Sequence, residues 1–258
     1  MESMPPLQVE GIDVCLGRGR SALDVLRGVS LQLNEGEILV VVGPSGIGKT
    51  TLLKVLAGLV RPQKGRVVMA GSPVRGPDRS RVMVFQEPAV FPWMTVRKNI
   101  EYAATQGDAP KADLRKGALG QLLDLADLRA RLDRFPGTLS TGMRRLVELA
   151  RALAAQPRVL LADEPFYAVD AHTRKSVRET LLRVIERSRM PMVLTSHDVE
   201  ESLLLADNIL VLQGRPASVT HVINVPFNRP RHPDLIYEPD FVALRRKIER
   251  LLPEAVGS

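Results

Sequence analysis

The spacing of apolar residues changes several times along the chain, and each change predicts a different element. Residues 7–14 and 29–33 alternate apolar with polar side chains, which is typical of half-exposed strands. Residues 38–42 are continuously apolar, as expected of a strand buried on both faces. Further strands are predicted at 65–70, 81–85, 159–162, 192–195 and 208–212.

Helical periodicity fills most of the chain between these strands. Helices are predicted at 51–59, 111–128, 146–155, 173–188, 199–206 and 241–252. Because strands and helices alternate, the pattern predicts an α/β fold with a mostly parallel, helix-wrapped sheet. The largely helical stretch 88–155 is interpreted as an insertion between two strands. A proline-rich segment from residue 226 leads into the last helix, which is basic and amphipathic.

One loop in this framework predicts phosphate binding. Residues 43–50 match G-x-x-x-x-G-K-[ST], after a predicted strand and before a predicted helix. Glycines let backbone N–H groups face phosphate oxygens, Lys49 can reach the β- and γ-phosphates, and the Thr50 hydroxyl can bind Mg²⁺. A glycine-rich turn with a chance lysine is the alternative, which the flanking elements disfavour. The predicted nucleotide-binding residues here are Gly43, Pro44, Ser45, Gly46, Ile47, Gly48, Lys49, Thr50 and Thr51.

Polar side chains follow three other predicted strands. Asp163 and Glu164 come directly after the strand at 159–162, and the carboxyl end of a parallel strand faces the ligand crevice. There Asp163 can hold Mg²⁺ and Glu164 can orient the attacking water, whereas a helix cap is the alternative for an isolated acid pair. Gln86 and His197 also follow predicted strands. For each of them an ordinary structural role in a loop is the alternative.

Composition narrows the class of protein. The chain has 36 Lys and Arg against 29 Asp and Glu, but the basic residues are scattered and only 4% of residues are aromatic. A nucleic-acid surface would gather charge and aromatics on one face, so a solvated surface or one near anionic lipid headgroups fits better. No apolar stretch has transmembrane length, residues 1–6 do not resemble a signal peptide, and Cys15 is the only cysteine. We therefore expect a cytoplasmic protein without a nucleic-acid partner.

Residues 139–145, which read LSTGMRR, are similar to the signature loop, usually written LSGGQ, of the ATP-binding-cassette (ABC) ATPases. Gln86 matches the Q-loop glutamine of that family, residues 168–170 match its D-loop, and His197 matches its switch histidine. The resemblance covers nearly the whole chain. Several motifs in the same order make it specific.

The resemblance implies an ABC ATPase fold: a P-loop core, an N-terminal antiparallel β region and an inserted α-helical subdomain. The implied single domain spans residues 7–225, with the core at 7–87 and 156–225 and the subdomain at 88–155; residues 226–258 form a C-terminal extension. It also implies a head-to-tail homodimer, or a pair with a related ATPase subunit. ATP and Mg²⁺ then lie between the phosphate loop of one copy and the signature loop of the other.

The resemblance also assigns roles to single residues. Asp170 would organise the dimer contact, and His197 would touch the γ-phosphate. The implied signature contacts with the partner's nucleotide are Ser140, Thr141, Gly142 and Met143, at the start of a helix whose dipole favours phosphate. The implied catalytic residues are Lys49, Gln86, Glu164 and His197. The implied Mg²⁺ ligands are Thr50, Gln86 and Asp163.

Four positions depart from the family pattern: Leu16, Thr141, and the milder changes Met143 for glutamine and Ser196 for threonine. Leu16 stands where many members have an aromatic residue that stacks on adenine, so it keeps an apolar contact but loses stacking. Thr141 stands at the first glycine of the signature, where a side chain would crowd a closely approaching nucleotide. The resemblance therefore implies ATP binding and hydrolysis, with the efficiency left open by Leu16 and Thr141.

Residues 85–100 resemble the Q-loop region of the nitrate, sulfonate, taurine and bicarbonate importers. In that subfamily, Phe91, Pro92 and Trp93 would line the groove that receives a short helix of a membrane subunit; a core position is the alternative for Trp93. The implied protein drives import of a small anionic solute from the cytoplasmic face of the inner membrane. Its implied partners are two permease subunits and, indirectly, a periplasmic or extracellular solute-binding protein.

Two other functions remain open from the sequence. A soluble ABC ATPase acting on nucleic acid or ribosomes would usually carry two cassettes or a long coiled coil, and this chain has no heptad run. A P-loop kinase or GTPase would not need a signature loop or a Q-loop.

Overall fold

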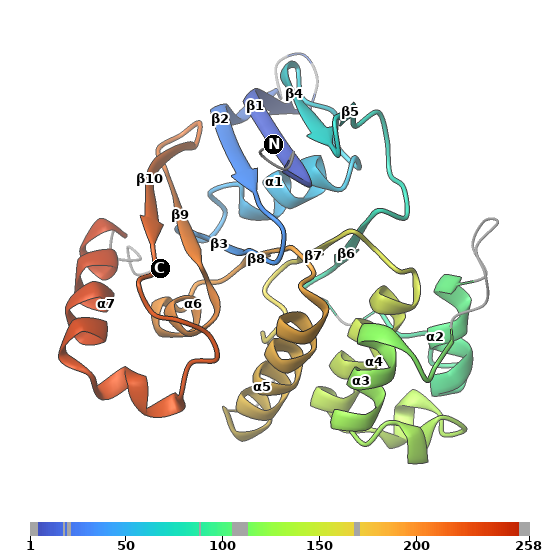
Figure 1. Cartoon of the computed structure of the whole chain (residues 1–258). Helices are drawn as coiled ribbons and strands as arrows, with labels where there is room; N and C mark the ends of the chain where they lie inside the picture. The colour runs from blue at the N-terminus through green and yellow to red at the C-terminus, as the bar shows by residue number, and fades with distance from the viewer. Residues whose placement is uncertain are drawn as a thin grey trace. The chain divides into compact units, whose positions relative to one another are not determined.

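A computed structural model describes residues 5–17, 19, 22–87, 89–104, 113–167 and 171–252 (Figure 1). The chain divides into two compact units, residues 1–78 with 191–258 and residues 79–190. The first unit contains the predicted phosphate loop. The second contains the predicted signature loop and the whole of the predicted subdomain.

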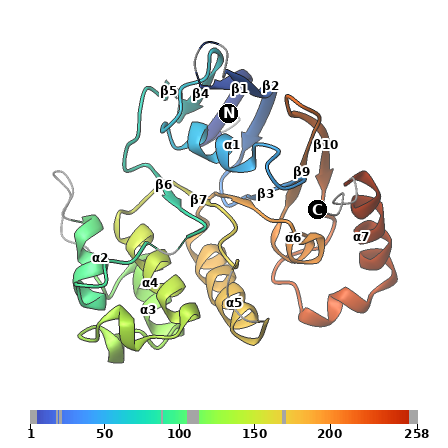
Figure 2. The same cartoon turned by 180° about the vertical axis from the view of Figure 1, so that it is seen from behind.

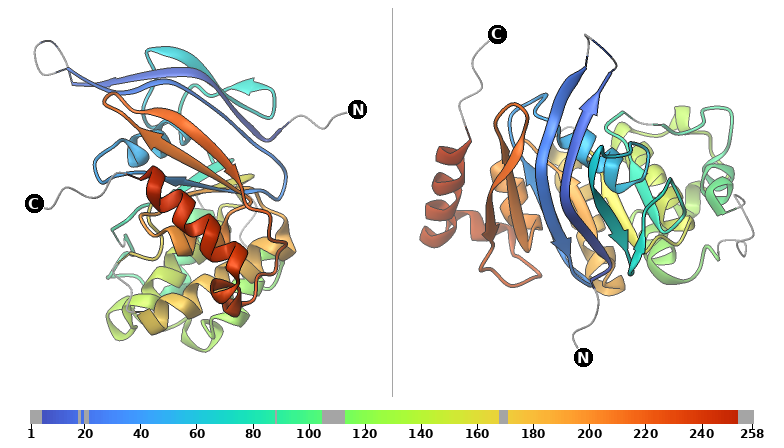
Figure 3. Two further views of the ribbon diagram at one scale, coloured as in Figure 1. Left: turned by 90° about the vertical axis from the view of Figure 1, so that its left-hand side faces the viewer. Right: turned by 90° about the horizontal axis from the view of Figure 1, so that it is seen from above.

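The first unit begins with four antiparallel strands. β1 (Leu7–Leu16), β2 (Leu23–Leu33), β4 (Lys64–Met69) and β5 (Ser72–Pro73) pair in the order β2-β1-β4-β5. Figure 3 shows β1 and β2 as two long neighbouring strands. Leu7, Ile12 and Val29 are fully buried, and a register shift between Val9 and Ile12 interrupts the alternation of β1. A Cβ at Gly65 would lie 2.2 Å from the Glu10 carbonyl oxygen, so the close approach of β4 to β1 requires glycine.

A second set of strands is mostly parallel. β3 (Ile38–Val42) pairs in parallel with β8 (Met192–Thr195) and β9 (Asn208–Gln213), and β10 (Ser218–Asn224) is antiparallel to β9. All five residues of β3 are buried, which explains its continuous apolar run. α1 (Lys49–Leu56) follows β3 and contacts β8, while α6 (Val199–Leu205) follows β8 and contacts β3. The helices therefore bury the apolar faces that these strands present.

The C-terminal extension packs on the first unit. It forms the 3₁₀-helix η4 (Pro233–Tyr237) and α7 (Pro239–Leu251), and α7 lies beside α6 (Figures 1 and 2). Phe241 and Ile248 of α7 are fully buried, and the Phe241 ring centroid lies 5.7 Å from that of Phe227. Arg231 donates to the Leu203 carbonyl of α6 at 3.0 Å.

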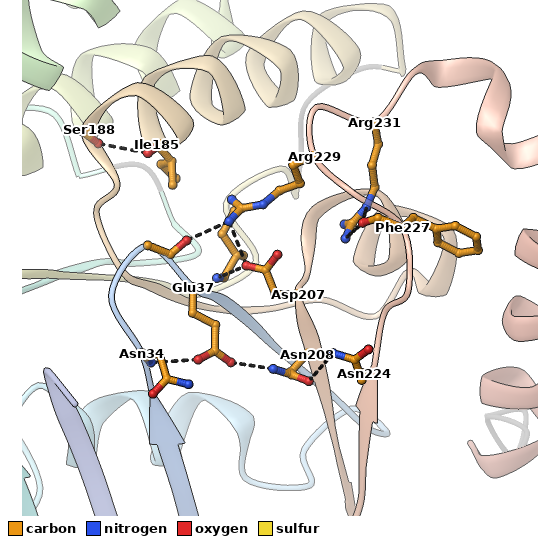
Figure 4. Close-up of polar contacts among 12 residues, drawn as sticks. Asn34, Glu37, Ile185, Ser188, Asp207, Asn208, Asn224, Phe227, Arg229 and Arg231 are labelled. Carbon is orange, nitrogen blue, oxygen red and sulfur yellow. Dashed lines mark hydrogen bonds and ion pairs between the residues drawn. The ribbon is translucent and has the colours of Figure 1, made fainter. Parts of the chain in front are cut away.

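A polar network joins this extension to β3 and β9 (Figure 4). Arg229 lies 2.9 Å from the Asp207 carboxylate, which also accepts the Ile38 N–H at 2.8 Å. The neighbouring Glu37 is buried and accepts from the Asn208 amide at 2.8 Å. Since these bonds satisfy backbone and side-chain groups at the start of two core strands, the extension is an integral part of the first unit.

The second unit combines two strands with helices (Figure 2). β6 (Arg81–Val84) pairs in parallel with β7 (Val159–Ala162). The helices are α2 (Val96–Ala104), α3 (Gly117–Leu125), η2 (Arg129–Arg131), η3 (Pro136–Thr138), α4 (Thr141–Ala154) and α5 (Ala171–Ser188). α4 contacts α2, α3, α5 and β6, so it is central to this unit. Among the described helices of the whole chain, none combines the length and apolar character needed to cross a bilayer.

The predicted helix at 111–128 is wrong in extent. The structure has a turn before α3, in which the Asp113 carboxylate accepts the Arg115 N–H. After α3, Asp127 takes a left-handed φ of +51°, which ends the helix. Local side-chain bonds of this kind compete with helix formation, and the apolar pattern alone does not reveal them. Lys111 and Ala112 lie outside the described residues.

Two strand predictions also need correction. β2 begins at Leu23, six residues before the predicted start, and β10 was not predicted. No residue of β10 is buried, so selection for apolar side chains is weak and the period-two signal is lost. Its place is decided by backbone pairing with β9.

Candidate functional site

The predicted phosphate loop turns tightly between β3 and α1. Gly46 and Gly48 have φ of +71° and +118°, and α1 begins directly after Gly48. The buried Lys49 side chain donates through Nζ to the carbonyls of Gly43 and Pro44, at 2.8 and 3.2 Å. The ammonium group is therefore held over the loop, where the helix N-terminus adds further positive potential. This arrangement suits an anionic phosphate chain.

The β1–β2 hairpin lies against this loop. A Cβ at Gly48 would be 2.9 Å from Val25 Cγ1 and 3.0 Å from Leu26 Cδ2, so the loop packs on β2 where glycine fits best. Leu16 at the end of β1 pairs with Leu23 at the start of β2, and both side chains are exposed. The hairpin register therefore places Leu23 opposite Leu16, the residue that the sequence predicts to contact adenine.

His197 lies at the same edge of the strands as the phosphate loop. β3 and β8 run in parallel, and the Ser196 N–H donates to the Val41 carbonyl at 3.2 Å. The buried Ser196 hydroxyl donates to Glu201 at 3.0 Å, and Asp198 caps α6 by accepting the Glu201 N–H. These bonds fix the backbone on both sides of His197, whose own side chain is exposed. The first unit therefore brings two of the predicted motifs together.

The second unit brings Gln86 together with the acid pair. Since β6 and β7 are parallel, both chains leave the strands at the same edge, and the Asp163 N–H donates to the Val84 carbonyl at 2.9 Å. Asp163 is buried. Glu164 has a left-handed φ of +43°, a conformation that costs a non-glycine residue about 1–3 kcal/mol and is concentrated at functional sites.

The predicted signature loop forms the N-terminus of α4. The Ser140 hydroxyl accepts the Met143 N–H at 3.2 Å and caps the helix. A Cβ at Gly142 would come 2.0 Å from Thr173 Cγ2, so α4 and α5 pack where only glycine fits. The hydroxyl of Thr141, the unusual residue of this loop, accepts from the Arg144 guanidinium at 3.1 Å.

A buried ion pair in the same helix was missed from the sequence. Arg145 and Glu148 lie 2.8 Å apart and are almost fully buried. Burial lowers the pKa of the Arg145 guanidinium and raises the pKa of the Glu148 carboxyl, and the attraction between the two charges opposes both shifts. Two opposite charges three residues apart on a helix are usually a surface pair. Only the packing of α4 shows that this pair is interior.

The described residues contain no group of three His, Cys, Asp or Glu side chains that could hold a metal ion by themselves. The predicted Mg²⁺ ligands are one hydroxyl, one amide and one carboxylate. This donor set suits Mg²⁺, which is commonly bound through one or two carboxylates together with substrate phosphates and water. Asp170 and the rest of the predicted D-loop lie outside the described residues.

Comparison with known proteins places the chain in a family. The family model described as "ABC transporter" matches residues 26–167. The taurine import ATP-binding protein TauB of Pseudomonas entomophila is 42% identical over 205 residues, which is 80% of this chain and 79% of that protein. The nitrate import ATP-binding protein NrtC of Synechocystis is 38% identical over 224 residues, which is 85% of this chain and 33% of that protein. The chain thus spans about a third of the length of NrtC and of the bicarbonate relative CmpC.

A solved structure agrees in fold. The dimeric ATP-binding cassette MJ0796, bound to ADP and Pi in a post-hydrolysis state, has a TM-score of 0.72 and 26% identity, covering 86% of this chain and all of that one. The predicted ABC ATPase fold is therefore confirmed. On the matched motifs, the relatives and this fold, the chain belongs to the ABC transporter family.

Proposed function

We propose that this chain binds and hydrolyses ATP as the nucleotide-binding subunit of an ABC transporter. The observation that carries the proposal is the phosphate loop, with the Lys49 ammonium buried over it and His197 at the same strand edge. A buried cation in a glycine-rich loop at a helix N-terminus is suited to the charge of a triphosphate. The first unit supplies this part of the site.

In this proposal the second unit supplies the groups that act on the γ-phosphate. Asp163 and Gln86 hold Mg²⁺ together with Thr50, and Glu164 orients the attacking water. Mg²⁺ held by these residues would neutralise charge that develops on the phosphate oxygens. His197 contacts the γ-phosphate. The strained backbone at Glu164 supports a functional role, because such conformations persist where a site requires them.

A second copy of the chain, or a related ATPase subunit, completes the site with its signature loop. The capped N-terminus of α4 offers N–H groups and a positive dipole end to phosphate. ATP then joins the two subunits, and its hydrolysis releases them, because the nucleotide binds the closed pair better than the open one. The hydrogen bond from the Arg144 guanidinium to the Thr141 hydroxyl supports this assignment, because it holds the Thr141 side chain against its own helix.

An aromatic cluster in the second unit is the proposed contact for a permease subunit. The Phe91 ring lies 5.5 Å from Trp93 and 5.0 Å from Tyr102, and Trp93 is 69% exposed. Exposed aromatic side chains that pack on one another are typical of protein interfaces. The exposure argues against the alternative that Trp93 is a core residue. Two permease subunits and an external solute-binding protein complete the proposed transporter.

The proposed cargo is a small anionic solute imported across the membrane, with this subunit on its cytoplasmic face. The names of the relatives support the class, since they include import proteins for nitrate, bicarbonate, aliphatic sulfonates and taurine. The transporter assignment is tested by purifying the chain from detergent-solubilised membranes and identifying the proteins that accompany it. The cargo is then tested by ligand screening of the solute-binding protein that is identified. Recovery of nucleic acid and no membrane protein would refute the transporter assignment.

The ATPase assignment is tested with Glu164→Gln. We expect the variant to bind ATP as the unchanged chain does, to lose about 10²–10⁴ in turnover, and to elute as a dimer with Mg-ATP in size-exclusion chromatography. The matched control is Glu238→Gln, which neutralises an exposed carboxylate between η4 and α7. This variant should behave as the unchanged chain. Normal turnover by Glu164→Gln, or a monomer in every condition, would contradict the proposal.

A further inference from the structure

Three charged side chains of α4 face one loop of the second unit. Arg145, Glu148 and Arg151 are spaced by three residues. The loop comprises residues 85–87 and 89–91, here called the Q-loop segment. Arg145 and Glu148 are 1% and 4% exposed. Burying charges is costly unless each finds several partners, so the partners of this pair show what it does.

Those partners are backbone groups of the Q-loop segment. Arg145 donates through Nη1 to the Phe85 carbonyl at 2.8 Å and through Nη2 to the Gln86 carbonyl at 2.5 Å. Glu148 accepts from Arg145 with one carboxylate oxygen and from the Ala89 N–H with the other. One ion pair therefore bonds to two separate parts of the segment: Arg145 holds Phe85 and Gln86, and Glu148 holds Ala89.

Arg151 continues this pattern toward the aromatic cluster. Its Nη1 donates to the Ala89 carbonyl at 2.7 Å, and its guanidinium carbon lies 5.1 Å from the centroid of the Phe91 ring. From the other side, Asn99 of α2 accepts the Phe91 N–H at 2.7 Å and donates to the Phe91 carbonyl at 3.0 Å. Side chains thus replace the regular backbone pairing that strands and helices provide.

We propose that Arg145, Glu148 and Arg151, here called the α4 ladder, are positioning residues that make the Q-loop segment and the signature helix move as one body. The inference rests on the proposed function, in which Gln86 contacts Mg²⁺ and the aromatic cluster contacts a permease. A permease bound at Phe91 and Trp93 then acts on α4 and Gln86 together, because the ladder joins the aromatic cluster, α4 and Gln86. Its end residues, Arg145 and Arg151, are six positions apart on one helix, so the ladder cannot shorten or shear without breaking charged hydrogen bonds.

The experiment replaces the buried pair with Arg145→Met and Glu148→Met together in the full chain. Removing both charges avoids leaving either one unpaired, so the fold is expected to persist. Hydrogen exchange at the Ala89 amide should become at least tenfold faster, and the fluorescence anisotropy of Trp93, the only tryptophan, should fall. Arg97→Met with Asp133→Asn removes an exposed pair of the same unit and should change neither measurement.

Turnover gives a second measurement. We expect the double variant to keep its ATP affinity within twofold, while the Mg²⁺ concentration for half-maximal turnover rises at least fivefold and turnover falls at least fivefold. A merely structural pair would not separate Mg²⁺ dependence from ATP affinity. Arg145→Lys, which keeps the charge but reaches fewer carbonyls, should be intermediate.

Unchanged exchange at Ala89 and unchanged Trp93 anisotropy in the double variant would overturn the ladder. If the double variant does not fold, Arg151→Met decides by the same two measurements, since Arg151 is only partly buried. Neither measurement needs turnover. If exchange becomes faster but the chain never hydrolyses ATP, the proposed ATPase function is refuted and the ladder is supported. If exchange is unchanged but the chain is an active ATPase, the ladder is refuted and the ATPase function is supported.

Discussion

The phosphate loop of the first unit and the Q-loop segment of the second are held in place in different ways. The phosphate loop is held by its own residues: the side chain of Lys49 bonds to carbonyls five and six positions earlier. The Q-loop segment is held by Arg145, which bonds to carbonyls about sixty positions earlier in the chain. The first loop is therefore fixed by local bonds in addition to its packing on β2, whereas the second is bonded to a distant helix.

This difference is suited to the two proposed tasks. A loop that binds phosphate gains from a geometry set by glycines and a neighbouring lysine, because these groups are close together in the chain. A loop that must move when a partner binds elsewhere needs a contact with a distant element of the chain. Four variants test how far this contrast extends, from the largest expected effect to the smallest.

Lys49→Ala should break the first loop as a binding element. The loss of a buried, charge-assisted contact with phosphate should weaken ATP binding by about 10- to 100-fold. Isothermal titration with ATP measures this change. Lys54→Ala, in the last turn of the same helix, is the control and should leave the affinity within twofold. An equal loss in both variants would mean that general charge, rather than the position of Lys49, determines the affinity.

Gly142→Ala should damage the second unit through packing. The added methyl group would meet Thr173 Cγ2 at 2.0 Å, and such overpacking costs about 1–3 kcal/mol of stability. Chemical denaturation measures the loss. Thr173→Ser removes the opposing methyl group, so the double variant should recover most of the stability. If it recovers none, the contact between α4 and α5 is not the reason that glycine is required.

Leu16→Tyr should sharpen the first site rather than break it. An aromatic ring at this exposed position can stack on adenine, with an expected gain of about 1 kcal/mol, or about fivefold in ATP affinity. Val222→Tyr places the same ring at an exposed position of β10 and should have no effect. A gain for ATP but none for inorganic triphosphate would locate the contact at the base. An equal gain for both ligands would contradict stacking.

Arg229→Met should have the smallest effect, a small loss of stability. It removes the pair between Arg229 of the C-terminal extension and Asp207, a contact between distant positions within the first unit. This pair is partly buried, with side chains 18% and 31% exposed, so we expect a loss of about 0.5 kcal/mol. Thermal unfolding of the full chain measures it. The control is Arg27→Met, whose pair with Asp24 is more than half exposed. Equal shifts in both variants would show that the C-terminal extension adds no stability through this contact.

Some of the fold could be predicted because the signal is local. Residues 38–42 are buried on both faces and read as an unbroken apolar run, and β7 and β8 have the predicted bounds. The exposed β10 gave no such signal. α3 is shorter than its apolar pattern because the Asp113 side chain and the backbone of Asp127 favour turns.

The candidate site divides in the same way. The phosphate loop, Asp163 and Glu164 are readable from the sequence because their chemistry requires particular residue types directly after a strand. The α4 ladder was missed because the sequence cannot distinguish an interior charge pair from a surface one.

The sequence by itself determined the family, the order of the motifs and the residue types that each motif supplies, since these depend on spacing along the chain. Only the tertiary structure decided what holds the Q-loop segment in place and how the C-terminal extension joins the first unit. The physical reason is that such contacts depend on burial, which makes a hydrogen bond between a charge and a carbonyl strong and an unpaired charge costly. Burial is a property of the packed chain.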